Sequence, residues 1–269
     1  MKYAFMTFSM PREGLQQVLE AARQFGYDGI EPRVESGHAH GVELGASPAA
    51  RRQMRGAAEK AGVAMACVAT SCLFADPQTA QRNVELGHRY IDLAADVGSS
   101  RIRVFGGAIG GGLSREAAIE LVARSLSSLA DHASERGVLV CMETHDDWCD
   151  PAHVAEVMGK VARPSIGVNW DLMHPVKRAG YTMDRAYEIL KKWVHHVHFH
   201  DGTLEGKLRP IPEGIVDHRS AVRLLRDAGY QGYLSGEWIN WEIGYPEHLP
   251  RELSTMKSYE GGRGIRRPR

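Results

Sequence analysis

The chain has 269 residues, and its 33 basic and 33 acidic side chains give zero formal charge and a pI near 7.2. This balance excludes the broad positive surface with which proteins collect nucleic acid phosphates. The sequence has no run of about 18 apolar residues and no signal-type N-terminus, so we expect a cytoplasmic protein that binds neither nucleic acid nor membrane. The four cysteines are too few for a disulfide framework, which predicts reduced thiols.

Short β-rich runs alternate with longer runs that carry apolar residues at helical spacing. The predicted strands are residues 3–9, 29–31, 63–70, 101–105, 138–144, 166–171, 194–198 and 233–237. The predicted helices are residues 13–25, 48–61, 79–97, 115–136, 151–161, 183–190, 220–228 and 248–259. This α/β pattern predicts a (β/α)8 TIM barrel as a single domain, residues 1–260, with a doubly wound open sheet as the alternative.

Several predicted helices carry end signals. Ser114 is a candidate N-cap, and Pro48 and Pro151 suit first helical turns. Glycines stand where helices should end, at Gly26, Gly62, Gly98, Gly137 and Gly229. Residues 261–269, GGRGIRRPR, lack periodicity and are basic, so we expect a flexible tail; packing on another subunit of a homo-oligomer, or on an anion, is the alternative.

Four consecutive predicted strands end in side chains that bind metals, namely Glu143, Asp171, His198 and Glu237. The ends of barrel strands meet at one face, where neighbouring strands lie about 4.8 Å apart. Carboxylates crowded there would repel one another unless a cation lay between them. We therefore predict one divalent metal ion, and the oxygen-rich donor set favours Mn²⁺, with Mg²⁺ or Co²⁺ as alternatives.

The predicted strand 194–198 and the residues after it carry three histidines, His196, His198 and His200, on one face. They differ in depth along the barrel axis. We prefer His198 as the metal ligand, with His196 one layer deeper supporting it and His200 above it near the substrate.

The sequence resembles the xylose-isomerase-like barrel superfamily of sugar (phosphate) isomerases and epimerases, which also contains endonuclease-IV-like proteins. The resemblance spans nearly the whole chain. It rests on the runs GYDGIE at 26–31, METH at 142–145, DLMH at 171–174, HFHD at 198–201, and GYQGY at 229–233 followed by Gly236 and Glu237.

In the ketose epimerases that this chain resembles, Glu, Asp, His and Glu hold the metal, matching Glu143, Asp171, His198 and Glu237. The resemblance implies that the two glutamates exchange protons with the substrate on opposite faces. It also implies that His174 and Arg209 contact substrate oxygens. Many relatives read His-x-Lys-Asp where this chain has His200 in place of the lysine.

These features lead us to expect a metal-dependent isomerase or epimerase that acts on a small sugar, keto-sugar or polyol through an enediolate. A dehydratase of a keto-sugar or inosose on the same scaffold is the alternative, because expulsion of a β-hydroxyl can follow the same proton abstraction. An endonuclease-IV-like nuclease is a remote alternative, since that group needs further histidine ligands and a basic groove. A non-catalytic sugar-binding barrel is more remote still.

Overall fold

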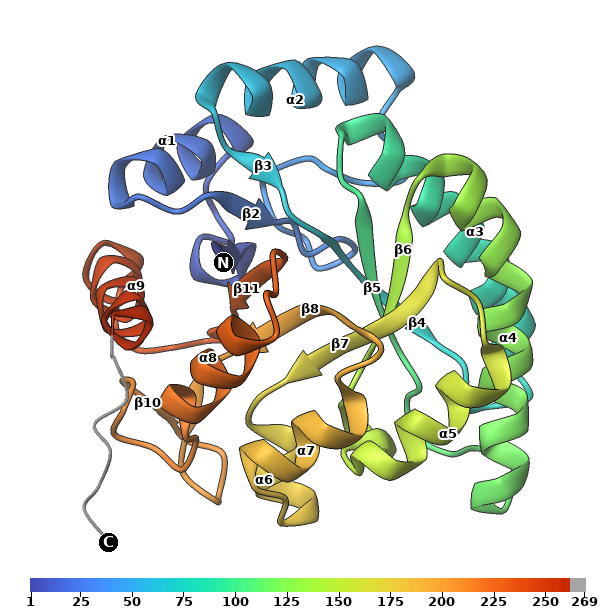
Figure 1. Ribbon diagram of the computed structural model, residues 1–269. Helices are drawn as coiled ribbons and strands as arrows, with labels where there is room; N and C mark the ends of the chain where they lie inside the picture. Colours follow the sequence, from blue (N-terminus) through green and yellow to red (C-terminus); the bar gives the residue numbers. More distant parts are fainter. Residues whose placement is uncertain (262–269) are drawn as a thin grey trace, which may run out of the picture.

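Parallel strands form a nearly closed barrel at the centre of the computed structural model, and helices surround it (Figure 1). The structure describes residues 1–261. The barrel strands are β1 (Lys2–Met6), β2 (Gly29–Glu31), β3 (Ala64–Met65), β4 (Val68–Leu73), β5 (Arg101–Phe105), β6 (Leu139–Glu143), β7 (Ile166–Asp171), β8 (Val194–Phe199) and β11 (Tyr233–Gly236). The helices are α1 (Leu15–Phe25), α2 (Pro48–Ala61), α3 (Ala80–Val97), α4 (Arg115–Arg136), α5 (Pro151–Val161), α6 (His174–Ala179), α7 (Met183–Leu190), α8 (His218–Asp227) and α9 (Tyr245–Glu260).

The barrel closes through a strand that is broken in two. The strand order is β3-β2-β1-β11-β8-β7-β6-β5-β4, and Ala66 and Cys67 separate β3 from β4. Both halves come from the predicted strand 63–70, and an isolated parallel bridge joins Arg33, just after β2, to Ala69 in β4. The nine strands thus occupy eight positions around one ring. The predicted TIM barrel is confirmed, and the open-sheet alternative is wrong.

The predicted helix ends also agree with the structure. The Ser114 hydroxyl accepts a hydrogen bond from the Ala117 amide at 3.2 Å, and Pro48 and Pro151 lie in the first turns of α2 and α5. Left-handed glycines end α1, α2, α3 and α4 at Gly26, Gly62, Gly98 and Gly137. These local signals determine where each helix begins and ends, and so where the next strand can start.

Two elements between the strand ends and the following helices were not predicted. The six-residue helix α6 begins directly after β7, and a small antiparallel hairpin, β9 (Asp201–Gly202) with β10 (Leu208–Arg209), follows β8. Two short 3-10 turns, η1 (Thr7–Ser9) and η2 (Asp146–Trp148), follow β1 and β6. Elements of two to six residues carry too few positions for a periodic pattern.

The four cysteines are unpaired and buried, as expected for reduced thiols. Among residues 1–261 there is no helix that is both long and apolar enough to cross a membrane. Residues 262–269 of the predicted tail, which began at residue 261, lie outside the described residues.

Substitution of Gly167 in β7 tests the strand packing that positions the site. A Cβ there would meet the His195 ring of the neighbouring strand and lie 2.7 Å from the Trp193 carbonyl oxygen. We expect Gly167→Ala to lower the free energy of unfolding by about 1–3 kcal/mol, as overpacking does. Gly159, an exposed residue of α5 whose Cβ would meet no atom within 4 Å, is the matched control.

We expect Gly159→Ala to raise the free energy of unfolding by about 0.5–1 kcal/mol, because alanine favours the helix. Urea unfolding of the two variants beside the unsubstituted protein measures both effects. Equal stability of Gly167→Ala and the unsubstituted protein would contradict the packing described for β7 and β8.

Candidate metal centre

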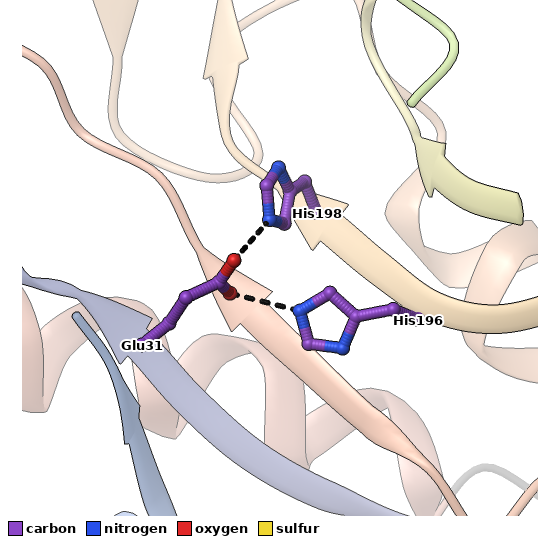
Figure 2. Close-up of side chains that lie close together, drawn as sticks. All are labelled: Glu31, His196 and His198. Atoms are coloured by element: carbon purple, nitrogen blue, oxygen red, sulfur yellow. Dashed lines mark hydrogen bonds and ion pairs between the residues drawn. The ribbon is translucent and has the colours of Figure 1, made fainter. Parts of the chain in front are cut away.

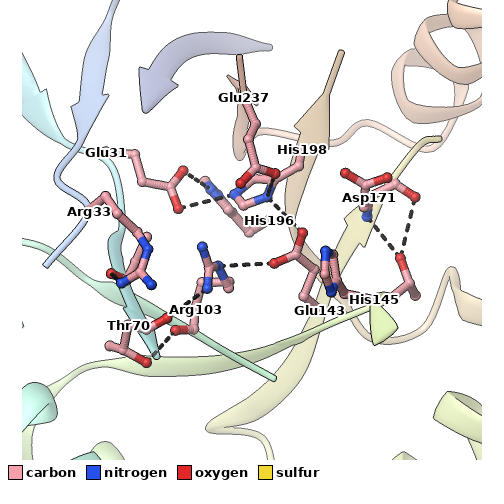
Figure 3. Close-up of polar contacts among 12 residues, drawn as sticks. Glu31, Arg33, Thr70, Arg103, Glu143, His145, Asp171, His196, His198 and Glu237 are labelled. Atoms are coloured by element: carbon pink, nitrogen blue, oxygen red, sulfur yellow. Dashed lines mark hydrogen bonds and ion pairs between the residues drawn. The ribbon is translucent and has the colours of Figure 1, made fainter. Parts of the chain in front are cut away.

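Four ligand-type side chains converge inside the C-terminal mouth of the barrel (Figure 3). Glu143 ends β6, Asp171 ends β7, His198 lies near the end of β8, and Glu237 directly follows β11. All four are at most 5% exposed, and each offers a ligand atom within 4.8 Å of the others. The register explains part of this convergence, since Asp171 and His198 are direct partners across β7 and β8. The strand-end positions predicted from the sequence are thus neighbours in space.

The electrostatics of this group fit a cation. His198 Nδ1 lies 3.1 Å from Glu143 Oε1 and 3.3 Å from Glu237 Oε2. Burial alone would lower the pKa of His198, but the carboxylates of Glu31 and Glu143 outweigh it and raise that pKa well above its ordinary value. Asp171 Oδ2 is buried without any hydrogen-bond partner. Three carboxylates, one of which has an oxygen without a hydrogen-bond partner, and one imidazole fit a divalent metal ion.

A buried carboxylate, Glu31, fixes the orientation of His198 (Figure 2). Its Oε1 lies 3.1 Å from His198 Nε2, and its Oε2 lies 2.8 Å from His196 Nε2. Burial raises the pKa of Glu31, but the two histidines lower it far more, so the carboxylate is ionised and both rings donate to it. His198 therefore presents Nδ1 to Glu143 and Glu237, as in carboxylate–histidine–metal arrangements.

Sequence reasoning assigned no role at the site to Glu31. The feature that could have identified Glu31 is its position at the end of strand β2, because all three residues of that strand are buried. A fully buried carboxylate needs partners, and histidines of matching depth were available on β8. His196 was expected to support His198, and in the structure the two rings are linked through Glu31.

Asp171 is oriented by the start of α6. Its Oδ1 accepts hydrogen bonds from the backbone amides of Met173 and His174, each at 2.8 Å. Its own amide donates to the Thr144 hydroxyl at 3.0 Å. The unpredicted helix α6 thus saturates one carboxylate oxygen and leaves Oδ2 for the centre.

Two arginines, Arg103 and Arg33, lie beside the centre on the side of Glu143. The sequence analysis assigned neither of them to the site. Arg103 Nε pairs with Glu143 Oε2 at 3.0 Å, while its Nη1 donates to the Thr70 carbonyl at 2.7 Å. Arg33 donates to Ser71 and to the Val34 carbonyl. Burial and the neighbouring Arg103 lower the pKa of Arg33 to about 10. The ion pair with Arg103 fixes the orientation of Glu143. The sequence feature that could have identified Arg103 is a charged residue in the middle of a barrel strand, β5.

His145, two residues beyond Glu143, forms a pair with Asp146. Its Nδ1 lies 2.8 Å from Asp146 Oδ1, and its ring centroid lies 4.3 Å from that of His174. Burial lowers the pKa of His145, but the hydrogen bond to Asp146 and the charge of Glu143 outweigh it and raise the pKa to about 9. Asp146 adopts φ 49°, a conformation that costs energy in a residue other than glycine. The turn η2 thus holds a proton-bearing imidazole beside the centre.

The three predicted substrate contacts lie at different places. His174 begins α6, and His200 follows β8, where its Nδ1 lies 2.9 Å from the Glu237 carbonyl oxygen and its Nε2 lies 3.4 Å from Asp171 Oδ2. Both rings therefore border Asp171. Arg209 is an exposed residue of the hairpin strand β10, paired with Asp201 across the hairpin. Its contact with substrate stays a prediction.

Comparison with known proteins places the chain in a family. The family model described as "Xylose isomerase-like TIM barrel" matches residues 19–259. A curated Xenopus laevis protein named "Putative hydroxypyruvate isomerase" is 24% identical over 160 residues, 55% of this chain and 57% of that protein. The aligned segment thus spans less than two thirds of that relative's length.

Two solved structures share the whole barrel. A probable 3-DHS dehydratase involved in petrobactin synthesis from Bacillus anthracis has a TM-score of 0.80 at 19% identity, covering 98% of this chain and 100% of the other. A D-psicose 3-epimerase, solved in the presence of D-fructose, has a TM-score of 0.80 at 16% identity, covering 97% and 100%. Identities this low establish the common fold alone, while the family model spans most of the sequence. The chain belongs to the xylose isomerase-like TIM barrel family.

Proposed function

We propose that this protein is a divalent-metal-dependent enzyme that isomerises or epimerises a small sugar, keto-sugar or polyol through an enediolate of the substrate. The observation that carries the proposal is the convergence of Glu143 and Glu237, from β6 and from the end of β11, on the same nitrogen of His198. A psicose 3-epimerase shares the fold, and a relative carries the name "Putative hydroxypyruvate isomerase", which supports this class of reaction.

The ion would be held by Glu143, Asp171, His198 and Glu237, whose ligand atoms lie within 4.8 Å of one another. When bound, it supplies Lewis-acid polarisation of a carbonyl and its adjacent hydroxyl. The donors favour a hard cation, and Mn²⁺ is our first choice, with Mg²⁺ or Co²⁺ as alternatives. Glu31 keeps His198 oriented, and Arg103 keeps Glu143 oriented.

In this proposal the two glutamates move the proton. Burial raises the pKa of Glu237, but His198 and Arg103 outweigh it and lower the pKa below its ordinary value, so Glu237 is ionised and can accept a proton. In its protonated form Glu143, whose Oε1 lies 3.1 Å from the same His198 nitrogen, would give a proton to the substrate. Return to the opposite face of the same carbon epimerises it, and return to the adjacent carbon isomerises the sugar.

One observation favours a dehydratase as the second candidate. Loss of a β-hydroxyl requires a proton for the leaving oxygen, and the His145–Asp146 pair holds one at the edge of the centre. A dehydratase shares the fold. In that reaction Glu237 would abstract the proton next to the carbonyl and His145 would protonate the departing hydroxyl.

Glutamine in place of either proton-transfer carboxylate is the first test. We expect Glu143→Gln and Glu237→Gln to lower turnover by about 10²–10⁴-fold, because an amide can neither take up nor give the proton at these positions. Turnover is followed on a panel of ketoses and keto-inositols, with circular dichroism as the check on folding. Glu135→Gln, on the exposed face of α4, should keep full activity. Full activity in either site variant would remove the proposal.

The reaction class is tested by running the same panel in D₂O. For an isomerase or epimerase we expect solvent deuterium at carbon in product that has kept its elements of water. A product lighter by one water molecule would identify the dehydratase instead. In that event His145→Gln should slow the elimination, because it removes the proton donor. Mass spectrometry of the products distinguishes the two results.

Glu31 is tested through metal affinity rather than turnover. We expect Glu31→Gln to weaken Mn²⁺ binding by about 10–100-fold, because His198 loses the charged acceptor that orients its ring. Calorimetric titration of metal-free protein measures the dissociation constant. Glu135→Gln again serves as the control. An unchanged affinity would mean that His198 is held in place without Glu31.

A further inference from the structure

A cavity lies at the C-terminal face of the barrel, next in the chain to the four-ligand centre. Its volume is about 420 Å³, within the range of about 300–1,000 Å³ that small ligands occupy. It lies between the segments that follow β1 and β11, which are neighbouring strands of the barrel. Glu237 directly precedes one of its wall residues, Trp238. The wall residues that matter most are Phe8, Ser9, Trp238, Trp241, Tyr245 and His248.

Three rings of this wall pack on one another. The Trp238 and Trp241 rings are nearly parallel, at 16° with centroids 6.2 Å apart. The His248 ring lies 5.0 Å from the first and 5.1 Å from the second. The six-membered ring of Trp238 packs over Gly236, where a Cβ would collide with it, so this indole has one fixed position. Rigid aromatic walls bury the apolar face of a ring-shaped ligand at little cost in entropy.

The same wall carries polar atoms that need a partner. Trp238 Nε1, Ser9 Oγ and His248 Nδ1 are buried, and none of them has a hydrogen-bond partner within the described part of the chain. Trp238 is 1% exposed and His248 is 2% exposed. Burial, together with the charge of Arg251, lowers the pKa of His248 to about 4, so its ring is neutral. An indole N–H, a hydroxyl and a neutral imidazole are suited to bind the hydroxyl groups of a ligand.

The charges around the cavity disfavour an anionic ligand. Glu13 and Glu242 line it, and Arg12 is the basic residue of its wall. A phosphate or a carboxylate would meet a net negative charge there, whereas a neutral ring with hydroxyl groups would not. The loop after Trp238 also holds Asn240 at φ 52°, a conformation that costs energy outside glycine and that is often retained at ligand sites.

We propose that this cavity binds a hydroxylated ring of the substrate that is remote from the reacting carbons, so that the substrate is a glycoside with two rings. The inference rests on the proposed function, because the reacting sugar would lie at the four-ligand centre and the second ring beyond Glu237. Binding of the remote ring would position the reacting carbons at the centre. An apolar ring face with hydroxyl groups at its edge belongs both to a second sugar and to a phenolic aglycone.

Three glucosides that differ only in the second ring test the proposal. Methyl β-D-glucoside has no second ring, cellobiose has a second sugar, and 4-hydroxyphenyl β-D-glucoside has a phenolic ring. Calorimetric titration of the Mn²⁺-loaded protein measures each dissociation constant. We expect at least one two-ring probe to bind about 10-fold more tightly than methyl β-D-glucoside, and the tighter of the two identifies the ring. Equal binding of all three probes would overturn the proposal.

Substitutions in the wall show whether the second ring binds in this cavity. We expect Trp241→Ala to remove the preference for two rings, because it removes an aromatic face. Ser9→Ala should weaken binding of the preferred probe by about 2–10-fold, the loss of one neutral hydrogen bond. Leu204→Ala removes a 62% exposed apolar side chain from the hairpin after β8 and should leave the preference unchanged. A preference that persists in Trp241→Ala would overturn the site.

The variant Glu143→Gln separates this proposal from the proposed function. Glu143 lies outside the cavity wall, so its substitution should abolish turnover and keep the preference for two rings. Equal binding of the three probes with turnover lost in Glu143→Gln would remove the ring site and leave the proposed function standing. Full activity of Glu143→Gln would remove the proposed function, and with it the assignment of the ring as part of a substrate.

Discussion

The repulsion among Glu143, Asp171 and Glu237 is the constraint on which the rest of the mouth depends. Their ligand atoms lie within 4.8 Å of one another and are almost wholly buried. Two unit charges at such a distance repel by about 4 kcal/mol even at an effective dielectric near 20. Arg103 supplies a positive charge to Glu143, His198 lies against Glu143 and Glu237, and two backbone amides donate to Asp171 Oδ1. A cation between the three carboxylates would offset this repulsion.

The barrel supplies the positions, and residues outside the ligand set supply the orientations. Strand pairing brings Asp171 opposite His198, but it does not decide which oxygen or which nitrogen faces the centre. Glu31 makes that choice for His198, and the first amides of α6 make it for Asp171. Arg103 does the same for Glu143. Loss of any of these neighbours would leave the ligand-type side chain on its strand but would change the orientation of its donor atoms. The effect of such a loss is therefore best measured as a change in metal affinity.

The sequence predicted the strands and the convergence of the four ligand-type side chains because both depend on local pattern. Alternation gives the strands, and a carboxylate or histidine at the end of each of four consecutive strands gives the centre. Glu31 and Arg103 could not be assigned in the same way. Glu31 bonds to His196 and His198 across the barrel, and Arg103 lies in the middle of β5 rather than at its end. The break between β3 and β4 depends on how the barrel closes, which no local pattern shows. The helix α6 has only six residues, too few for a periodic pattern.

In the proposed function, the choice between isomerisation and elimination rests on which group delivers the second proton. In the proposed function both reactions would begin when a carboxylate such as Glu237 takes the proton next to the carbonyl, so the same four side chains would serve either one. They diverge at the next proton, which returns to carbon in one case and goes to a leaving oxygen in the other. Glu143 and His145 lie two residues apart and are the two groups that could deliver it, one held by Arg103 and the other by Asp146. If the reacting carbon lies against Glu143, the proton returns to carbon; if the leaving hydroxyl lies against His145, the hydroxyl is expelled. The side chains that orient the substrate decide between these two positions.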